Sequence, residues 1–509
     1  MVASLHLQII SGFVFLLAAY LLKKLEAKRG REPLPPGPKG LPILGNILQW
    51  PKEAGWKTFA EWRRTYGDIV YCNLAGDPWV VLNSPQAAQD LFEKKGSIYC
   101  DRPYMTMSSE LVGWRETLLD IAPYDERTRE LRRLITKQLG SKTNLGGYAD
   151  LLQTQVQRFL RRVLDDPESE RLGTHIRTTI AAVILDIAYG YEVQEKDDPL
   201  IRLADGTLKE LVQVLTPGAY LVDSLPLLRH IPDWLPGAGF KRVAARMRRH
   251  REELVDTPFL RVKEQLAHGT AKPSFTASLL EQPGVTSADE DFIKAAASII
   301  YTGGSDTTIP NAHSFFLAMT LHPSAQATAQ AELDRVVGPD RLPTLADRPM
   351  LPYVDALARE VLRRYPAIPQ GLPHVSREED VYAGFRIPKG ANVIANIWRF
   401  CRDPATYADP LAFKPERFLG PTPERDPRDF VFGFGRRVCP GINLADSWVF
   451  LAVAMSLATL SISPATDADG NAIIPKEEHT TGVISYPKPF PCSIKPRSSK
   501  AEALVRALD

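Results

Sequence analysis

One cysteine stands in a setting suited to metal chemistry. Residues 432–441 read F-G-F-G-R-R-V-C-P-G, and an apolar helix is expected from Ile442. A cysteine just before a helix meets the positive end of the helix dipole, which favours the thiolate, and Arg436 and Arg437 add positive charge. With no second cysteine nearby, the segment does not suit structural zinc, which needs four ligands. Cys439 is therefore a nucleophile, the single protein ligand of a haem iron, or an inert buried thiol.

A second unusual run lies between two apolar stretches that look like one helix. Residues 299–310 read I-I-Y-T-G-G-S-D-T-T-I-P. Glycine, threonine, serine and proline are poor helix formers, and the acid is costly to bury. Pro310 also removes the backbone N–H that would bond to Asp306. We expect a broken helix in which Asp306 and Thr307 serve chemistry, because a simple kink needs neither an acid nor paired threonines.

Helical patterns dominate the elements that must position these two segments. Residues 126 to about 335 read as helix almost throughout, and further helices are expected over Trp56–Tyr66, Pro85–Lys95 and Ile442–Leu460. Short strands are expected at Ile69–Asn73, Trp79–Leu82, Val381–Ile387 and Val393–Trp398. No repeat or linker divides residues 47–509. The sequence therefore predicts a mainly α fold with a minor β component in one catalytic domain.

Composition narrows the classes of protein. The 509 residues are 44% hydrophobic and 24% charged, as in ordinary globular proteins. A net charge of +2 gives no reason to expect nucleic-acid binding. The five cysteines are odd in number and contain no C-x-x-C pair, which argues against a disulfide scaffold and fits a reducing compartment.

The first residues predict a membrane anchor. Residues 5–22 form an uncharged stretch, and as a helix they would cover about 27 Å, close to the thickness of a bilayer core. Basic residues follow this stretch and none precede it, so the rest of the chain is expected in the cytosol. A cleaved signal peptide and a buried helix are the alternatives. Residues 1–32 are then the anchor with its basic flank, and residues 33–46, P-L-P-P-G-P-K-G-L-P-I-L-G-N, are a stiff extended hinge.

The cysteine segment fits the spacing F-x-x-G-x-R-x-C-x-G, met by Phe432, Gly435, Arg437, Cys439 and Gly441. At this point the sequence resembles the cytochrome P-450 family of haem-thiolate monooxygenases. The resemblance implies the cytochrome P-450 fold and haem b with the thiolate of Cys439 on the iron. It also implies that the glycines let the loop turn under the macrocycle, that Phe432 packs near the sulfur, and that Arg437 pairs with a haem propionate.

Three further segments match the family in the same order along the chain. Residues 303–308, G-G-S-D-T-T, fit its [A/G]-G-x-[D/E]-T-[T/S] pattern, residues 360–363 fit E-x-x-R, and residues 415–418 read P-E-R-F. The resemblance implies that Thr307 orients a water for proton delivery to dioxygen and that Asp306 links it to bulk protons. It further implies a buried ionic cluster of Glu360, Arg363 and Arg417 that fixes the haem-binding core.

One departure from the family concerns the propionates. The family shows W-x-x-x-R in its helix beneath them, but here Thr128 stands in the tryptophan place while Arg132 keeps the arginine place. The resemblance then leaves Arg132, Arg437 and His374 to hold the haem. It also implies substrate-pocket segments at residues 105–121, 297–308, 368–372 and 481–484, with candidates Ala297, Gly303, Ile368, Leu372 and Val483.

The function implied by the resemblance is a single-pass monooxygenase of the endoplasmic reticulum membrane. It would insert one oxygen atom from O2 into a lipophilic small molecule, in fungal secondary metabolism or xenobiotic hydroxylation. Electrons would come from an NADPH-dependent cytochrome reductase, with cytochrome b5 as a second donor, docking near Arg127, Arg129, Lys137, Arg436 and Arg437. Two alternatives are a reductase-independent haem-thiolate isomerase or dehydratase and a non-enzymatic haem-binding sensor.

Overall fold

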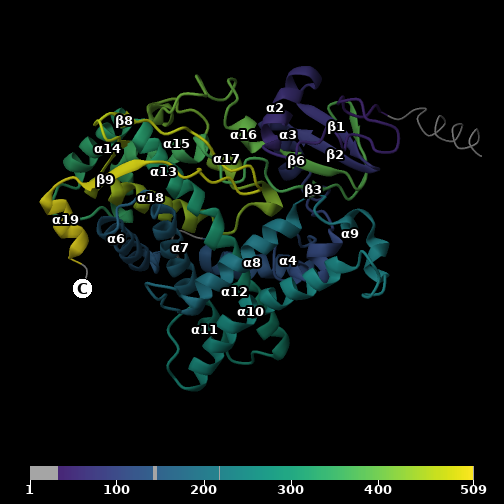
Figure 1. Cartoon of the computed structure of the whole chain (residues 1–509), viewed down its shortest axis with the longest axis horizontal. Helices are drawn as coiled ribbons and strands as arrows, with labels where there is room; N and C mark the ends of the chain where they lie inside the picture. Colours follow the sequence, from purple (N-terminus) through teal and green to yellow (C-terminus); the bar gives the residue numbers. More distant parts are fainter. Residues whose placement is uncertain (1–31, 141–145, 217, 508–509) are drawn as a thin grey trace, which may run out of the picture.

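The computed structural model describes residues 32–140, 146–216 and 218–507. The predicted anchor over residues 5–22 lies outside these ranges. Helices make up most of the described chain, and the strands gather in small sheets at its margins (Figure 1). The prediction of a mainly helical fold with a minor sheet component is confirmed.

The longer helices are most frequent between residues 126 and 364, with others near both ends of the described chain. Their bounds are α2 Gly55–Tyr66, α4 Glu126–Leu139, α6 Ala149–Asp165, α7 Leu172–Tyr189, α8 Pro199–Leu215, α10 Gly239–Ala267, α12 Ser287–Thr307, α13 Ile309–Leu321, α14 Pro323–Val336, α15 Pro352–Arg364, α18 Ile442–Thr459 and α19 Ser499–Arg506.

Short helices and turns connect them. The short α-helices are α3 Pro85–Gln89, α9 Leu221–Ser224, α11 Phe275–Leu280, α16 Ile397–Phe400 and α17 Arg428–Val431. Two π-helical turns are η1 Asp90–Lys94 and η2 Thr106–Leu111. The 3-10 turns are η3 Trp114–Glu116, η4 Pro226–His230, η5 Leu345–Met350, η6 Pro415–Phe418 and η7 Gly435–Arg437.

Three small sheets complete the described part of the chain. The first has the order β1-β2-β6-β3, the second pairs β4 with β5, and the third has the order β8-β7-β9. In the first sheet β2 and β6 run parallel, while the other paired strands are antiparallel. The bounds are β1 Ile69–Leu74, β2 Asp77–Leu82, β3 His374–Val375, β4 Asp380–Tyr382, β5 Phe385–Ile387, β6 Asn392–Ala395, β7 Leu460–Thr466, β8 Ala472–Ile473 and β9 Cys492–Pro496.

The proline-rich segment after residue 32 packs against the first two sheets. Tyr71 of β1 donates its N–H to Pro36 O at 3.0 Å, and Arg386 of β5 donates its N–H to Pro33 O at 2.8 Å. A Cβ on Gly37 would lie 1.9 Å from Tyr71 O, so only glycine allows this approach. Residues 33–40 contain no helix or turn, and backbone bonds hold them to the two sheets. Residues 41–45 differ from the expected extended segment, because Leu41 and Gly45 bond to each other and close a tight turn.

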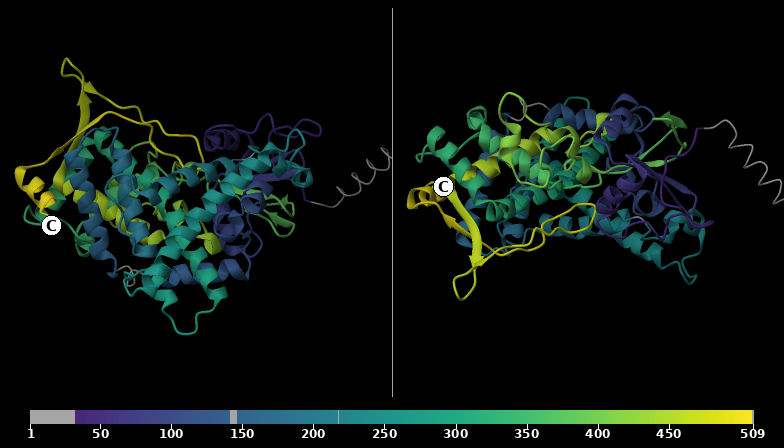
Figure 2. Two further views of the ribbon diagram at one scale, coloured as in Figure 1. Left: turned by 60° about the horizontal axis from the view of Figure 1, so that its bottom comes forward. Right: turned by 90° about the horizontal axis from the view of Figure 1, so that it is seen from above.

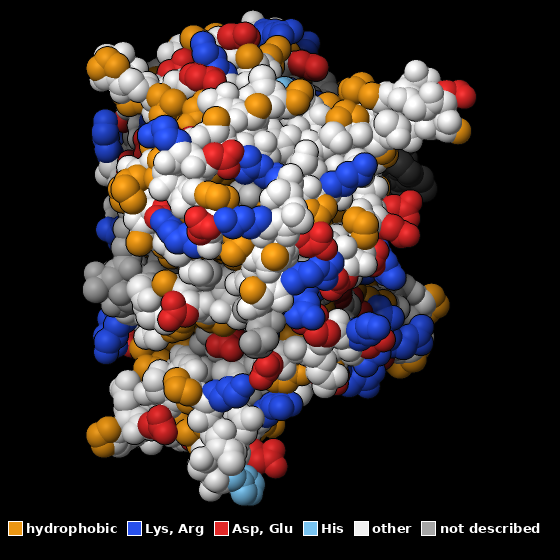
Figure 3. All heavy atoms as spheres, turned by 90° about the vertical axis from the view of Figure 1, so that its left-hand side faces the viewer, with side chains coloured by type: hydrophobic (Ala, Val, Ile, Leu, Met, Phe, Trp, Pro, Cys, Tyr) orange, Lys and Arg blue, Asp and Glu red, His pale blue; other side chains and the backbone are white. Residues whose placement is uncertain are grey.

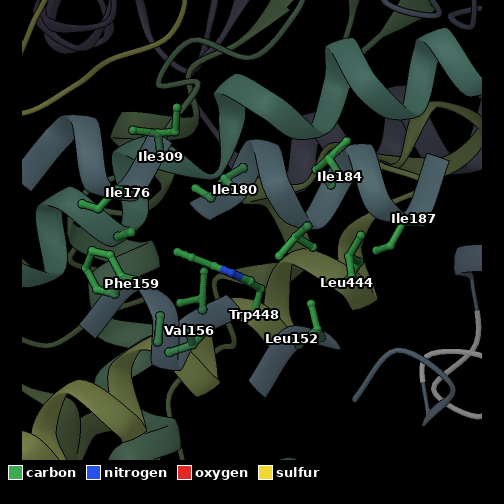
Figure 4. Close-up of a cluster of buried hydrophobic side chains, with 14 of the residues drawn as sticks. Leu152, Val156, Phe159, Ile176, Ile180, Ile184, Ile187, Ile309, Leu444 and Trp448 are labelled. Atoms are coloured by element: carbon green, nitrogen blue, oxygen red, sulfur yellow. The ribbon is translucent and has the colours of Figure 1, made fainter. Parts of the chain in front are cut away.

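A large apolar core lies where α6, α7 and α18 meet. Isoleucines 176, 180, 184 and 187 of α7 form one row, because residues three or four apart share a helix face. Figure 4 shows this row facing Val156 and Phe159 of α6 and Leu444 and Trp448 of α18. Burying each such side chain stabilises the fold by about 1.5–3 kcal/mol.

Helix α18 is the only described helix long and apolar enough to cross a membrane by composition. Two thirds of its length is buried, 67%, so it serves as a core helix. It begins at Ile442, as predicted, so the loop that contains Cys439 lies directly before its first turn.

Two predicted elements end earlier than their sequence suggests. The expected strand over Val393–Trp398 stops at Ala395, because Asn396 accepts the N–H of Arg399 at 3.2 Å and starts α16. The expected helix over Pro85–Lys95 widens into the π-helical turn η1 from Asp90.

The C-terminal segment runs across the helices. Residues between β8 and β9 pass back toward the middle of the molecule and return to β9 (Figure 2). The end of the molecule that carries α19 shows acidic and basic side chains interspersed over its surface (Figure 3). Ion pairs join some of them, including Arg497 with Asp334 at 2.7 Å and Arg506 with Asp165 at 2.7 Å.

Candidate functional site

The loop before α18 holds Cys439 through tight backbone turns. Cys439 donates its N–H to Phe432 O at 2.8 Å, and Val438 donates its N–H to Gly435 O at 3.2 Å. Gly435 has φ +47°, and a Cβ there would lie 2.5 Å from Phe92 O. Both the positive φ and the close approach require glycine. The loop is thereby packed against η1.

Cys439 is a half-buried residue, while the other four cysteines are fully buried. Burial raises the pKa of the Cys439 thiol to about 11, although the N–H of Gly441 works against this rise. The thiol is therefore protonated at neutral pH in the chain alone. A bound metal ion would deprotonate it outright.

Three arginines gather near this loop. Arg132 of α4 donates to Val438 O at 2.6 Å. Arg437 donates to the carbonyls of Cys100, Leu119 and Ala122 at 2.7–2.9 Å. Arg102 donates to the carbonyls of Leu372 and Pro373 at 2.9 and 2.8 Å.

These arginines are short of negative charge. Burial, followed by the neighbouring guanidinium of Arg437, lowers the pKa of Arg102 to about 9, and burial and Arg132 lower that of Arg437 to about 10. The Arg102 Nε is buried and has no hydrogen-bond partner among the described residues. Asp120 is the acid whose charge acts on all three. The cluster therefore suits an anionic ligand.

The residues fit haem better than a bare metal ion. No described group of three or more His, Cys, Asp or Glu side chains could hold a metal. Haem would bring its own nitrogen ligands to the iron and would need only one strong ligand from the protein, which the sulfur of Cys439 would supply. Its carboxylates match the cationic cluster of Arg102, Arg132 and Arg437. The donor set and the charge thus agree with a haem site.

His374 lies beside this cluster. The ring is stacked on Phe92 at 4.0 Å, and Nδ1 lies 2.6 Å from Tyr99 O. Burial and then the charge of Arg102 lower the pKa of His374 well below its ordinary value, so the ring is neutral. With Nδ1–H donating to Tyr99 O, Nε2 of the neutral ring carries no proton and is a hydrogen-bond acceptor.

Thr128 serves its own helix. Its hydroxyl donates to Pro123 O at 2.6 Å, and its N–H donates to the side chain of Asp125 at 2.9 Å. Asp125 is thereby the N-cap of α4, and the hydroxyl of Thr128 ties the first turn to the residues before it. Among the expected docking residues, Arg129, Lys137 and Arg436 are exposed. Arg437 is only 7% exposed and its donors meet backbone carbonyls, so its assignment as a docking residue is wrong.

Glu360, Arg363 and Arg417 meet in one buried cluster. Arg363 Nε lies 2.7 Å from Glu360, and Arg417 Nε lies 3.2 Å from it. The side chains of Glu360 and Arg363 are 0% exposed. Arg363 also donates to three carbonyls of the segment before η6, and Lys414 donates its N–H to Glu360. The cluster thus joins α15 to the chain that leads into the cysteine loop.

The apolar helix is broken where the polar run predicts. Helix α12 ends at Thr307 and α13 begins at Ile309, with Pro310 in its first turn. The Thr307 hydroxyl donates to Gly303 O at 2.9 Å. Ile184 of α7 packs so close to Gly304 that a Cβ there would lie 2.6 Å from it. The second glycine of the run therefore lets α7 approach α12.

Both the side-chain carboxylate and the backbone carbonyl of Asp306 accept hydrogen bonds from other segments. Its carboxylate accepts from Arg177 Nη1 of α7 at 3.3 Å, and the same nitrogen lies 3.1 Å from Asp205 of α8. Its backbone carbonyl accepts from Tyr486 Oη at 3.2 Å. Asp205 is 34% exposed and Asp306 15%, so the charged groups lead from the surface toward the helix break.

The structure brings three of the expected pocket segments together. Ser485 donates its N–H to Ala367 O at 2.9 Å, which joins the segment of Val483 to that of Ile368 and Leu372. The bond from Tyr486 to Asp306 then joins both to α12. Gly303, Ile368, Leu372 and Val483 are half-buried. Ala297 is different, since it is 0% exposed within the main core.

Sequence reasoning missed four polar residues of this region: Arg102, Asp120, Arg177 and Tyr486. None belongs to a spaced motif. The only available signal was Asp120, a formal charge within the predicted pocket segment of residues 105–121. Such a charge needs an oppositely charged or hydrogen-bonding partner, which would have pointed to nearby arginines.

Comparison with known proteins agrees with this geometry. The sequence pattern of the family described as Cytochrome P450 matches residues 35–492. The chain is 48% identical to "Cytochrome P450 monooxygenase 208" of Postia placenta over 99% of this chain and 98% of that protein. It is 43% identical to "Cytochrome P450 monooxygenase claR" of Ampulloclitocybe clavipes over 97% and 90%, and 38% identical to "Cytochrome P450 monooxygenase ppsD" of Aspergillus oryzae over 97% and 94%. The chain therefore belongs to the cytochrome P450 family, a family of haem-thiolate monooxygenases.

Proposed function

We propose that Cys439 is the axial haem ligand of a membrane-anchored monooxygenase that oxygenates a lipophilic small molecule. The observation that carries the assignment is the setting of this one residue. It is half-buried just before α18, beside three arginines that outnumber Asp120, the acid whose charge acts on all of them. Cys492, by contrast, is buried in β9, and burial alone raises its pKa to about 12.

Haem, when bound, supplies the activation of dioxygen, and this chain supplies its position and its protons. Arg132, Arg437 and Arg102 would hold the haem carboxylates. His374 would donate Nε2–H to them only in its protonated form, which their negative charge would favour. The backbone bonds of Phe432, Gly435 and Gly441 would set the direction of the sulfur. Because the arginines repel one another without a ligand, binding the carboxylates also relieves their repulsion.

Protons would reach the oxygen through the helix break. Thr307 can orient a water there, because its hydroxyl accepts while it donates to Gly303 O. The carboxylate of Asp306 would pass protons toward it, through the contacts with Arg177 and Asp205 that lead outward. Such delivery is needed for oxygenation and not for the rearrangement of a peroxide. The alternatives of an isomerase, a dehydratase or a sensor are not favoured, since the relatives are named monooxygenases.

Electrons and substrate would approach from different sides. The exposed Arg129, Lys137 and Arg436 are candidates for an acidic NADPH-dependent reductase or for cytochrome b5. Residues 5–22 would anchor the chain in the membrane of the endoplasmic reticulum, where lipophilic substrates dissolve. A role in fungal secondary metabolism or xenobiotic hydroxylation fits this location. The half-buried Gly303, Ile368, Leu372 and Val483 would line the substrate pocket.

The ligand assignment is tested by the carbon monoxide difference spectrum of the reduced full-length protein in membranes. We expect the red-shifted Soret band of a thiolate-ligated haem in the unaltered protein. Cys439→Ala should abolish it together with substrate-dependent NADPH consumption, while Cys492→Ala should keep both. The opposite pattern would assign the haem to Cys492. Absence of the band from the unaltered protein would refute the proposal.

The substrate class is tested by product analysis with a co-expressed reductase. A panel of terpenoids, polyketides, indoles and xenobiotics should yield at least one product heavier by one oxygen atom. That atom should come from labelled O2 and not from labelled water. Products of unchanged mass would instead support an isomerase.

A further inference from the structure

The break between α12 and α13 leaves one backbone carbonyl without its usual partner. In a continuous helix, the carbonyl of Asp306 would accept the N–H of residue 310. Pro310 has no N–H to give. Tyr486 Oη supplies the missing donor and lies 3.2 Å from Asp306 O. A side chain 180 residues away in the sequence therefore takes the place of a helix bond.

The phenol of Tyr486 is placed by its own segment. Tyr486 donates its N–H to Thr480 Oγ1 at 3.0 Å, and Thr480 donates its N–H to Tyr486 O at 2.7 Å, which closes a tight loop. Ser485 Oγ donates to Thr480 O at 2.9 Å, and Ser485 N–H donates to Ala367 O. The segment is thus tied both to itself and to the chain after α15. Its hydroxyl is held in place before it meets α12.

Asp306 is consequently fixed at two points. Tyr486 holds the carbonyl, and Arg177 holds the carboxylate at 3.3 Å. Burial, and then the charge of Asp306, raise the pKa of Tyr486 far above neutral, so its hydroxyl remains a donor at every physiological pH. The hydrogen bond from Tyr486 to Asp306 O therefore does not respond to pH. It is a constant restraint on the peptide that joins Asp306 to Thr307.

We propose that Tyr486 is a positioning residue that fixes the peptide between Asp306 and Thr307 by replacing the hydrogen bond lost at Pro310. The proposal rests on the assignment of those two residues to proton delivery. Without the phenol, the carbonyl has to take a water or turn toward another donor. Either change rotates the shared peptide and moves the Thr307 hydroxyl. Protons then arrive less reliably, and reduced oxygen escapes as hydrogen peroxide.

The test is a double-mutant cycle in the haem-loaded, full-length protein with its reductase. The variants are Tyr486→Phe, Pro310→Ala and the two together. In the Pro310→Ala protein the alanine N–H can bond to Asp306 O, so the phenol is no longer needed. We expect Tyr486→Phe alone to lower product formed per NADPH by about three- to tenfold, the effect of one ordinary hydrogen bond, and to raise peroxide. Added to Pro310→Ala, the same change should have no effect.

Hydrogen exchange gives a readout that does not depend on turnover. In Tyr486→Phe, the amides of residues 303–316 should exchange faster, and Pro310→Ala should restore their protection. Tyr189→Phe is the matched control. Tyr189 is a buried tyrosine of α7 that packs against Tyr301 of α12, and its hydroxyl has no hydrogen-bond partner within the described chain. Its removal should change neither exchange nor coupling.

Two results would overturn the proposal. An equal loss of coupling from Tyr486→Phe in both backgrounds would show that the phenol acts on the substrate, and unchanged exchange would show that it does not hold the break. Failure of the underlying assignment looks different. Suppose that Tyr486→Phe speeds exchange but leaves the product formed per NADPH unchanged. The hydrogen bond from Tyr486 then holds the helix break, but Asp306 and Thr307 do not deliver protons. The proposed role of Tyr486 in coupling would be wrong as well.

Discussion

The cysteine loop and the helix break lie on different elements and are held by different kinds of partner. On the cysteine side, Arg437 donates to three main-chain carbonyls and Cys439 bonds to the backbone of Phe432. At the break, Asp306 depends on a phenol and a guanidinium, both from side chains of other segments.

The difference decides which substitutions matter at each place. A main-chain carbonyl is supplied by any residue, so the partners of Arg437 survive most changes of side chain. The partners of Asp306 exist only while residues 177 and 486 keep their identities. The cysteine side should therefore fail through loss of its own glycines and arginines, while the break should respond to changes far away in the sequence.

The largest expected effect comes from removing a charge of the buried cluster. Arg363→Leu leaves the carboxylate of Glu360 without its closest partner at a site that is 0% exposed. We expect a loss of about 3–5 kcal/mol in the free energy of unfolding, because Glu360 keeps only the longer ion pair with Arg417 and three carbonyls lose a hydrogen-bond donor. Chemical denaturation followed by circular dichroism measures it, with recovered haem content as a second readout.

A surface pair provides the control for that experiment. Arg497 pairs with Asp334, whose side chain is 57% exposed, so Arg497→Ala should cost only about 0–1 kcal/mol. Similar losses from the two variants would contradict a special role for the buried cluster on the cysteine side.

A smaller effect is expected at Gly435. Gly435→Ala places a Cβ 2.5 Å from Phe92 O in a residue with φ +47°. Strain at positive φ and displacement of the backbone together should cost about 2–4 kcal/mol and weaken haem retention. The matched variant is Gly76→Ala, where φ is +102° but no atom lies within 4 Å, so it carries the φ strain alone. Equal losses of stability would show that the approach to η1 is not tight.

The smallest expected effect is a pH dependence on the side of the helix break. Burial lowers the pKa of His313 on α13 from its ordinary 6.5 to about 4. Below pH 6.5 the unfolded chain takes up a proton that the folded chain refuses until about pH 4, so stability falls as pH falls through this window. The loss should reach up to about 2 kcal/mol between pH 7 and pH 5. The loss should be smaller by this amount, but not absent, in His313→Gln when denaturation curves at the two pH values are compared, because burial also lowers the pKa of His374 and His479. An undiminished loss in that variant would contradict the assignment.

Sequence alone predicted the parts of the site whose chemistry is local. Glycines beside a cysteine predict a turn, and helix-breaking residues in an apolar stretch predict a break, so residue types and spacing are enough to locate Cys439 and the break at Thr308. Glu360 and Arg363 are three residues apart in one helix, which already makes them neighbours.

The remaining contacts depend on segments that meet only in the folded chain. Nothing in the spacing of Tyr486 or Arg177 indicates that they reach Asp306, because the loop after β8 and helix α7 approach α12 through tertiary packing. The expected strand over Val393–Trp398 ran too far for a related reason. Its apolar residues suit a strand, but the side chain of Asn396 caps a helix instead. Nothing in the sequence indicated that Arg437 is buried, because its carbonyl partners lie more than 300 positions earlier.

Those distant carbonyls also set an order of events during synthesis. The carbonyls of Cys100, Leu119 and Ala122 leave the ribosome some 315 to 337 residues before the arginine that binds them. At about 5–20 residues per second this interval lasts from roughly a quarter of a minute to a minute. During it the early part of the chain is present without its partner. A site that uses Arg437 and Cys439 can therefore be completed only late in synthesis, and a chain that ends before residue 437 cannot complete it.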